Sequence, residues 1–357
     1  MAGLSKFINH ERKKPEYEPT VTLVVTARNE ERVIREKIQN SFELDYPDHL
    51  LNILIVSDDS TDCTNAYVRD YADPRIALLE LVKRHGKTAA QNVAVQNAQS
   101  EILVFSDANA MYDSKAIKHL VKHFEDPQIG CVSGELFYLN SKGSSVGEEE
   151  GLYWRYEKFI KKQEDKVGTI LGVNGSIYAV RRSCYVSLNH DIISDFIEPL
   201  EIVYNGYRVL FESAAKSYEE ASSEFEEELT RKRRIVTRSI RSLLKHKHLL
   251  NPFRSPMLAF ELFSHKILRW FSPVLSAIIF LLNLGLLYNP FFFFLFILQI
   301  LFYLSGFFGH LVRHSAKIPR FIMLPYYICL LGVSSLLGIW DVVRGKKAVF
   351  WEPIRSN

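Results

Sequence analysis

Two apolar stretches in the first third of this chain end in carboxylate side chains. One runs directly into Asp58 and Asp59, and the other runs into Asp107 and Asn109. In open α/β sheets, ligands bind just beyond the carboxyl ends of the strands. Carboxylates at that place suit a hydroxyl, a heterocyclic base or a divalent cation that bridges a diphosphate. These four residues are therefore the first candidates for chemistry.

A third motif lies between the two acidic ends. The residues Arg84-His85-Gly86-Lys87 open a stretch with helical spacing. A helix that starts with glycine and lysine suits an anion such as a nucleotide phosphate, because its first amides point away from the helix. Each motif alone is also what an ordinary turn contains, since Asp, Ser and Gly are common turn residues.

The elements that must position these residues alternate between strand and helix. Continuous apolar or β-branched runs predict strands, and the polar-apolar stretches between them predict helices. Such alternation is typical of an α/β fold with a mostly parallel sheet flanked by helices. The predicted strands cover residues 22–26, 51–56, 76–81, 102–105, 130–139 and 171–180, and the predicted helices cover residues 30–40, 61–71 and 87–98.

The C-terminal third contains three hydrophobic segments without charge, at residues 270–287, 290–309 and 321–340. Each has about 18 to 20 residues, near the length that crosses a ~30 Å hydrocarbon core as a helix. Three such segments in series favour an integral membrane protein over buried helices of a soluble core. Pro325 and several small residues leave a broken or re-entrant third segment as an alternative to a full crossing.

Composition narrows the function classes. The formal net charge is only +3, which argues against a nucleic-acid-binding protein. The four cysteines show no metal-ligand spacing and are expected to be reduced thiols. The first 18 residues are polar and charged, so we expect no cleavable signal peptide. The uncharged segments carry few polar groups, which disfavours a transporter or channel.

A basic segment precedes the first hydrophobic one. Residues 229–269 contain eleven Lys or Arg and a single acid, Glu261. Val236, Ile240 and Leu243 recur at helical spacing opposite the basic residues. A basic amphipathic helix beside a membrane span is typical of a helix in the membrane interface, drawn to anionic headgroups. A solvated charged face is the alternative.

Taken together and in order, these motifs resemble the family 2 glycosyltransferases, whose nucleotide-sugar domain has the GT-A fold. The resemblance covers roughly residues 20–245 and is specific as a set rather than motif by motif. The motifs are residues 26–30 (TARNE), 56–62 (VSDDSTD), 84–87 (RHGK), 106–109 (SDAN), 153–157 (YWRYE), 174–182 (NGSIYAVRR) and 193–200 (ISDFIEPL).

The resemblance implies a nucleotide-sugar site. Asp58 would read the base, usually uracil, and Lys87 would lie near the diphosphate. Asp107 and Asn109 match the DxD element that holds Mg²⁺ or Mn²⁺ on the diphosphate. Asn109 replaces an acid, so the metal would be held more weakly, because an amide oxygen brings no charge. The remaining residues of the implied donor site are Ala27, Glu30, Asp59 and Arg84.

The resemblance also assigns an acceptor side. Asp195 stands at the place of the family's general base, although the acid that usually precedes it is a serine here. Asp191 is a weaker candidate. Trp154 and Glu157 would line the acceptor site, with packing against the sheet as the alternative reading.

Processive members of the family carry Gln-(Gln/Arg)-x-Arg-Trp after the base. Here residues 231–235 read RKRRI, so Arg234 aligns while the glutamine and tryptophan are missing. Arg234 could still contact the diphosphate. Without the tryptophan, the stacking platform for a growing chain has no support in the sequence.

The function expected is that of a membrane-bound inverting glycosyltransferase. It would move a sugar from a nucleotide donor, expected to be a UDP-sugar, to a lipid-linked or glycan acceptor in surface-polysaccharide or glycolipid synthesis. The alternatives are a processive polysaccharide synthase and a non-catalytic membrane scaffold. The expected location is the plasma (inner) membrane, with several spans and a cytoplasmic catalytic domain, and no oligomeric state is predicted.

The expected organisation follows from these segments. It comprises a polar tail at 1–19, a GT-A domain at 20–228, a basic membrane-interface segment at 229–266, two or three spans within 267–343, and a basic tail at 344–357.

Overall fold

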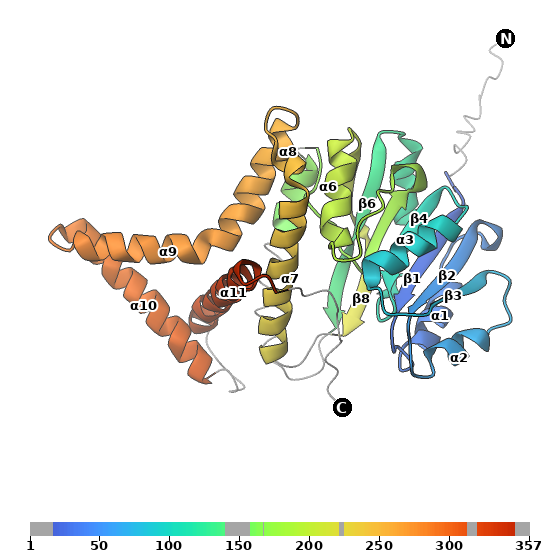
Figure 1. The fold of residues 1–357 in the computed structure, drawn as a ribbon, viewed down its shortest axis with the longest axis horizontal. Helices are drawn as coiled ribbons and strands as arrows, with labels where there is room; N and C mark the ends of the chain where they lie inside the picture. The colour runs from blue at the N-terminus through green and yellow to red at the C-terminus, as the bar shows by residue number, and fades with distance from the viewer. Residues whose placement is uncertain (1–16, 140–157, 167, 221–224, 313–319, 347–357) are drawn as a thin grey trace, which may run out of the picture.

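The computed structural model describes residues 17–139, 158–166, 168–220, 225–312 and 320–346. Its centre is an eight-stranded sheet with the order β3-β2-β1-β4-β7-β6-β8-β5, with helices packed on it (Figure 1). The strands are β1 (Val21–Ala27), β2 (Leu51–Asp58), β3 (Ile76–Leu81), β4 (Ile102–Asp107), β5 (Met111–Tyr112), β6 (Ile129–Leu139), β7 (Ile177–Arg181) and β8 (Arg208–Glu220).

Helices of the sheet domain connect these strands. They are α1 (Ile34–Phe42), α2 (Thr64–Arg69), α3 (Lys87–Asn97), α4 (Ala116–Val121) and α6 (Ser194–Tyr204), with 3₁₀ turns at Asp48–Leu50, Lys122–Glu125 and Arg182–Cys184. The predicted helix at 30–40 therefore begins only at Ile34. Residues 28–33 instead form a loop in which Asn29 is left-handed, with φ of 51°.

Strands β3, β2, β1 and β4 form a parallel half-sheet, as the sequence predicted. In register, Ala27 pairs with Ser57 and Thr26 pairs with Asp107, so the carboxyl ends of three strands meet at one edge. Alternate residues of each strand enter two apolar clusters: Leu23 and Val25 lie in one, and Val24 lies in the other. Burial on both faces explains why these strands are continuously apolar in sequence.

The second half of the sheet is mixed. β7 pairs antiparallel with both β4 and β6, while β6 pairs parallel with β8. The strand predicted at 171–180 is shorter than expected, because β7 begins at Ile177 and residues 171–176 form a loop. β8, β5 and α6 had no counterpart among the predicted elements.

The basic segment folds into α7 (Phe225–Lys245), which lies between the sheet domain and the C-terminal helices (Figure 1). Its apolar side is covered by protein: Val236 and Leu243 are buried in a cluster with residues of α6. Gly338 of the last helix lies so close that a Cβ there would be 2.9 Å from Val236. The apolar stripe of this helix is therefore largely used for intramolecular packing.

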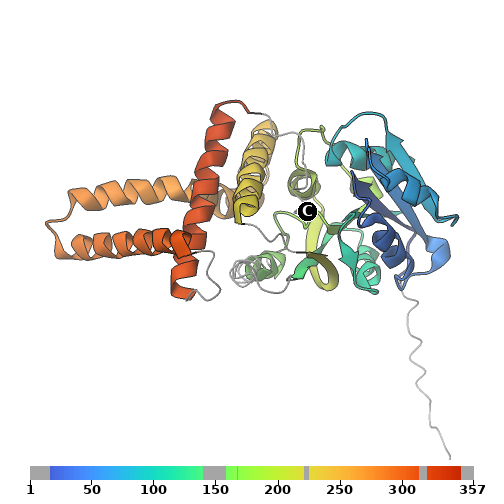
Figure 2. The ribbon, with the colours of Figure 1, turned by 90° about the horizontal axis from the view of Figure 1, so that it is seen from below.

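Among the described residues, three helical stretches are long and apolar enough to cross a membrane: Pro256–Gly285, Pro290–Val312 and Ile322–Val343. The first joins α8 (Pro256–Glu261), a π-helical turn (Leu262–Ile267) and α9 (Leu268–Gly285); the others are α10 (Pro290–Val312) and α11 (Arg320–Val343). α9 and α10 project away from the sheet domain, and α11 packs against α7 (Figures 1 and 2).

α11 is one continuous helix, so the third segment is not broken, and its full crossing of the membrane stays a prediction. Pro325 lies near its start, where the hydrogen bond it removes would reach only to residue 321 in the first turn. Among its small residues, Gly338 serves packing against α7, where a Cβ would lie 2.9 Å from Val236, and Gly306 of α10 does the same across the α10–α11 pair, 2.8 Å from the Cys329 sulfur. Small residues let neighbouring apolar helices approach closely.

Candidate active site

A cavity of about 420 Å³ opens at the carboxyl edge of β1, β2 and β4. Its walls come from two parts of the fold. One is the parallel half-sheet with the start of α3, and the other is formed by the loop 173–176, the start of α6, the end of β8 and one side of α7. Both acidic strand ends that the sequence singled out therefore open into one space.

Asp58 is fixed by the turn before α3. Its two carboxylate oxygens accept hydrogen bonds from the amides of His85, at 2.7 Å, and Gly86, at 2.8 Å. Gly86 has φ of 90°, a conformation that side chains disfavour, which explains the glycine there. The buried Asp58 carboxylate thus has a set orientation on the cavity wall.

Asp59 is placed differently from its neighbour. It has φ of 60° and does not line the cavity. Its carboxylate lies 3.5 Å from Arg28, whose guanidinium also donates to the carbonyl oxygens of Asp58 and Asp59. Asp59 therefore ties the β1 and β2 loops together, and its predicted role in the donor site stays a prediction.

Lys87, at the start of α3, links the carboxyl edge of the parallel half-sheet to the opposite side of the cavity. Its ammonium group forms an ion pair with Asp107 and donates to the carbonyl oxygen of Gly175, at 2.9 Å. Burial lowers the pKa of Lys87, but the carboxylates of Asp107 and Asp195 outweigh burial, so the pKa stands above its ordinary value. The lysine is therefore held as a cation beside both acids.

Asp195 lies in the first turn of α6, where the helix dipole favours a carboxylate. A Cβ on Gly175 would be only 2.6 Å from its Oδ2 and 3.2 Å from the Lys87 Nζ, so glycine is required there. Burial raises the pKa of Asp195 and Asp107 adds to the rise, while Lys87 and Arg238 act against it. The net direction is upward, which suits a group that must accept a proton.

Glu219 at the end of β8 is an acid of the cavity that the sequence analysis missed. Burial raises its pKa to about 7, and the nearby Asp107 carboxylate adds to the rise. Its Oε1 is buried and has no hydrogen-bond partner within the described part of the chain. Its β8 neighbour Tyr218 pairs with Met111, two residues after Asn109, which explains how it reaches the DxD-like element.

Four basic residues of α7 line the cavity: Arg231, Lys232, Arg234 and Arg238. Burial lowers the pKa of Arg234 to about 10, and the like charges of Arg238 and Arg231 contribute. Guanidinium and ammonium groups gathered on one wall suit an anionic ligand, which they bind through charge-assisted hydrogen bonds. The alternation of basic and apolar residues is the signal for this face of α7 in the sequence, and the pattern alone does not distinguish a cavity wall from a membrane surface.

Comparison with known proteins assigns the fold. Residues 22–185 match the family described as glycosyl transferase family 2. This chain carries a family 2 glycosyltransferase domain. It is 27% identical over 188 residues to a beta-monoglucosyldiacylglycerol synthase from a Nostoc species, covering 50% of this chain and 40% of that protein. It is 23% identical over 202 residues to a poly-beta-1,6-N-acetyl-D-glucosamine synthase from Staphylococcus aureus, covering 55% and 48%.

The aligned part of this chain thus spans less than half the length of these relatives. A solved mannosyltransferase from Pyrobaculum calidifontis, determined with GDP-Man and Mn²⁺, has the same fold with a TM-score of 0.69. Its identity is 22%, and the match covers 93% of this chain and 89% of that one. The likeness confirms the GT-A-like sheet followed by apolar helices. The family match ends at residue 185, before Asp195, Glu219 and Arg234.

Most of the residues predicted for the site meet in the cavity of the glycosyltransferase domain. Asp191 does not, because its carboxylate forms an ion pair with Lys245 on the last turn of α7. Trp154 and Glu157, predicted for the acceptor side, lie outside the described residues. The predicted residues that line the cavity are Ala27, Glu30, Asp58, Arg84, Lys87, Asp107, Asn109, Asp195 and Arg234.

Proposed function

We propose that this protein is a membrane-bound inverting glycosyltransferase. It transfers a sugar from a nucleotide donor, a UDP-sugar in our proposal, to a lipid-linked or glycan acceptor in glycolipid or surface-polysaccharide synthesis. One observation carries the proposal. A single cavity combines Asp58, the Lys87–Asp107 pair and Asp195, each held by backbone contacts or packing.

In this proposal, the donor occupies the parallel half-sheet side. Asp58 accepts a hydrogen bond from the base, since its oxygens keep lone pairs beyond those used by His85 and Gly86. Ala27 and Glu30 border the base, and Arg84 and Arg234 flank the diphosphate. The basic residues of α7 on the cavity wall support this placement, because guanidinium and ammonium groups bind phosphate oxygens through charge-assisted hydrogen bonds.

The cavity fits a divalent metal ion, which is Mg²⁺ or Mn²⁺ in the proposal. Asp107, Asn109 and Glu219 provide oxygen ligands of the type that these hard cations take, and the orphaned Glu219 Oε1 is available for that purpose. When bound, the metal neutralises charge on the departing diphosphate. Glu219 in this role offsets the charge that Asn109 lacks.

Asp195 is the proposed general base. As the acceptor hydroxyl oxygen forms its bond to the anomeric carbon, Asp195 takes the hydroxyl proton and the bond to the nucleoside diphosphate breaks. Lys87 favours the ionised form of the Asp195 carboxylate and faces the leaving group at the same time. Attack from the side opposite the diphosphate inverts the anomeric configuration.

The apolar helices support a membrane location, and we propose the plasma membrane with the catalytic domain in the cytoplasm. Arg313 and Lys317, which lie between α10 and α11 in the sequence, and Arg320 at the start of α11 agree with a cytoplasmic position, which is where positive charges concentrate. α7 then lies at the membrane surface, and its basic residues at the cavity face an acceptor that arrives from the lipid side.

A single transfer is favoured over polymer synthesis by the residue at position 235. Ile235 lines the cavity where processive members carry tryptophan, and its side chain is 41% exposed. An aliphatic side chain lacks the flat aromatic face on which a sugar ring stacks. We therefore propose one sugar added per acceptor.

The test is a donor panel with the full-length protein in detergent or nanodiscs. UDP-, GDP- and dTDP-sugars are supplied with Mn²⁺ and membrane lipid extract, and released nucleoside diphosphate and product size are measured. We expect consumption of one UDP-sugar and one discrete product. Consumption of GDP-mannose would overturn the proposed donor, a ladder would overturn single transfer, and no turnover with any donor would overturn the enzyme.

A further inference from the structure

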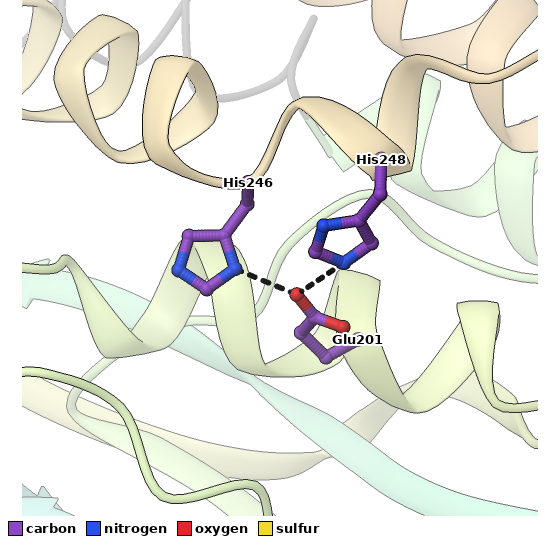
Figure 3. Close-up of side chains that lie close together, drawn as sticks. All are labelled: Glu201, His246 and His248. Carbon is purple, nitrogen blue, oxygen red and sulfur yellow. Dashed lines mark hydrogen bonds and ion pairs between the residues drawn. The ribbon is translucent and has the colours of Figure 1, made fainter.

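Three side chains outside the cavity converge on one point, as Figure 3 shows: Glu201, His246 and His248. The Oε1 atom of Glu201 lies 2.7 Å from the His246 Nδ1 and 2.9 Å from the His248 Nε2. All three of these atoms lie within 4.8 Å of one another. One carboxylate oxygen thus faces two imidazole nitrogens from a segment 45 residues away in sequence.

The packing of α6 against the turn after α7 holds these three side chains together without a ligand. Glu201 lies on α6, in which it is buried, and the two histidines bracket Lys247 in the turn that follows α7. Leu249 anchors that turn, because its side chain is fully buried. The ring of Tyr204, one turn after Glu201, contacts the His248 ring edge-on with centroids 5.0 Å apart. Each ring therefore has a fixed direction.

The donor set is that of a transition-metal site. Two imidazole nitrogens and one carboxylate oxygen are the ligands of open zinc sites, in which water takes the remaining position. Nitrogen ligands favour Zn²⁺ and its neighbours over Mg²⁺ or Mn²⁺, which prefer oxygen. In the hydrogen-bonded state each neutral ring donates its N–H to Glu201. Moving that proton to the other ring nitrogen frees the inward nitrogen for a metal.

We propose that Glu201, His246 and His248 bind a divalent transition-metal ion of the Zn²⁺ type, with water completing its coordination. The ion fastens α6 to the turn after α7. These are the two helices that carry Asp195 and the basic residues to the cavity, so the site braces both at the end away from the cavity. The inference does not depend on the proposed transferase activity.

The proposal is tested on the full-length protein in detergent after treatment with a chelator. Zn²⁺ is added in a calorimetric titration, and Co²⁺ in an absorption titration that reports nitrogen ligation and low coordination number. We expect one Zn²⁺ site that His246→Gln and His248→Gln each weaken at least about tenfold, since even changes next to metal ligands cost roughly 10–100-fold in affinity. Zn²⁺ should also raise the melting temperature of the wild type.

Two control variants make the result specific. His49→Gln changes an exposed histidine in the turn before β2 and should leave Zn²⁺ affinity unchanged. Asp107→Asn should also retain the site, which separates it from any metal bound in the cavity. Circular dichroism checks that each variant is folded; His248→Gln is the safest, because its side chain is 44% exposed.

The proposal is overturned if the chelator-treated wild type binds no more Zn²⁺ than the His246→Gln/His248→Gln double variant. It is equally overturned if binding disappears in Asp107→Asn but persists in the histidine variants. In both cases the three residues would be a hydrogen-bonded contact between α6 and the turn after α7 only.

Discussion

The two sides of the cavity are built in different ways. One wall, called the strand wall here, comes from neighbouring parallel strands, whose register brings Asp58 and Asp107 to the same edge. The opposite wall, called the packed wall, is assembled from the start of α6, the end of β8 and one side of α7. The strand wall is thus set by strand pairing, whereas the packed wall also depends on how α7 is held between α6 and α11.

The largest change in turnover is expected from Asp195→Asn on α6. Removing the proposed base should lower turnover by roughly 10²–10⁴-fold, the usual contribution of general-base catalysis. Burial and Asp107 raise the pKa of Asp195, so the folded state disfavours its charge. Because the pKa of Asp195 is raised on folding, the wild-type protein loses stability as the pH rises through the folded-state pKa of this group. An asparagine carries no charge, so at neutral pH the Asp195→Asn variant should melt at a higher temperature than the wild type. Nucleoside-diphosphate release and thermal melting measure both effects.

The same raised pKa predicts the pH dependence of turnover. Activity should rise with pH as Asp195 loses its proton, and the midpoint should lie above the ordinary range of an aspartate. In the Asp195→Asn variant the residual activity should lose this limb. A limb that persists unchanged in the variant would assign the proton transfer to another group.

Gly175→Ala should have the next largest effect, because it acts where the two sides meet. The added methyl would lie 2.6 Å from the Asp195 Oδ2, so that carboxylate and Lys87 must shift. Displacement of reacting groups by about 1 Å can cost about 10²-fold in rate. Gly172→Ala in the same loop is the matched control, because its nearest contact would be an ordinary 3.7 Å. Equal activity of the two variants would contradict the tight approach.

The proposed role of Glu219 as a metal ligand is tested by removing its charge and adding a charge at position 109. Glu219→Gln should weaken Mn²⁺ binding in the presence of nucleoside diphosphate by about tenfold, since it removes one charged oxygen ligand. Adding Asn109→Asp should restore much of that affinity. Mn²⁺ binding is measured by electron paramagnetic resonance. If Asn109→Asp gives no recovery, Glu219 does not compensate for the asparagine.

The smallest effects come from two adjacent arginines of α7 with different partners. Arg233 forms a two-pronged ion pair with Asp341 of α11, at 2.6 and 2.7 Å, whereas Arg234 lines the cavity. Arg233→Gln should cost about 1–2 kcal/mol of stability, hence a few degrees in melting temperature, without changing diphosphate affinity. Arg234→Gln should weaken diphosphate binding about tenfold with little change in melting. Identical behaviour of both variants would remove the distinction between the two faces of α7.

The strand wall could be predicted from the sequence because its signals lie in short stretches of the chain. Continuous apolar strands, their carboxylate ends and the glycine before α3 all fall where the parallel half-sheet requires them. Asp59 is the exception, since an acid in a left-handed turn looks the same in sequence as one that points into a site.

The packed wall could be predicted only in part. Glu219 lies at the end of a long strand whose residues are neither strictly alternating nor continuously apolar, so neither β8 nor its acid stood out. The arginines of α7 were visible as a basic stripe, but only the packing of Val236 against Gly338 shows which way that stripe faces. Asp195 was found through the family resemblance rather than from local pattern.

The most direct test of this difference is nucleoside-diphosphate binding with Mn²⁺, measured by calorimetry in two variants that each remove one acid of the cavity. The account predicts that Asp195→Asn binds as tightly as wild type or slightly tighter, because it removes a negative charge from the cavity. Asp107→Asn should lose most of the binding, because it removes both a metal ligand and the partner of Lys87. Loss of binding in Asp195→Asn, or intact binding in Asp107→Asn, would contradict the account.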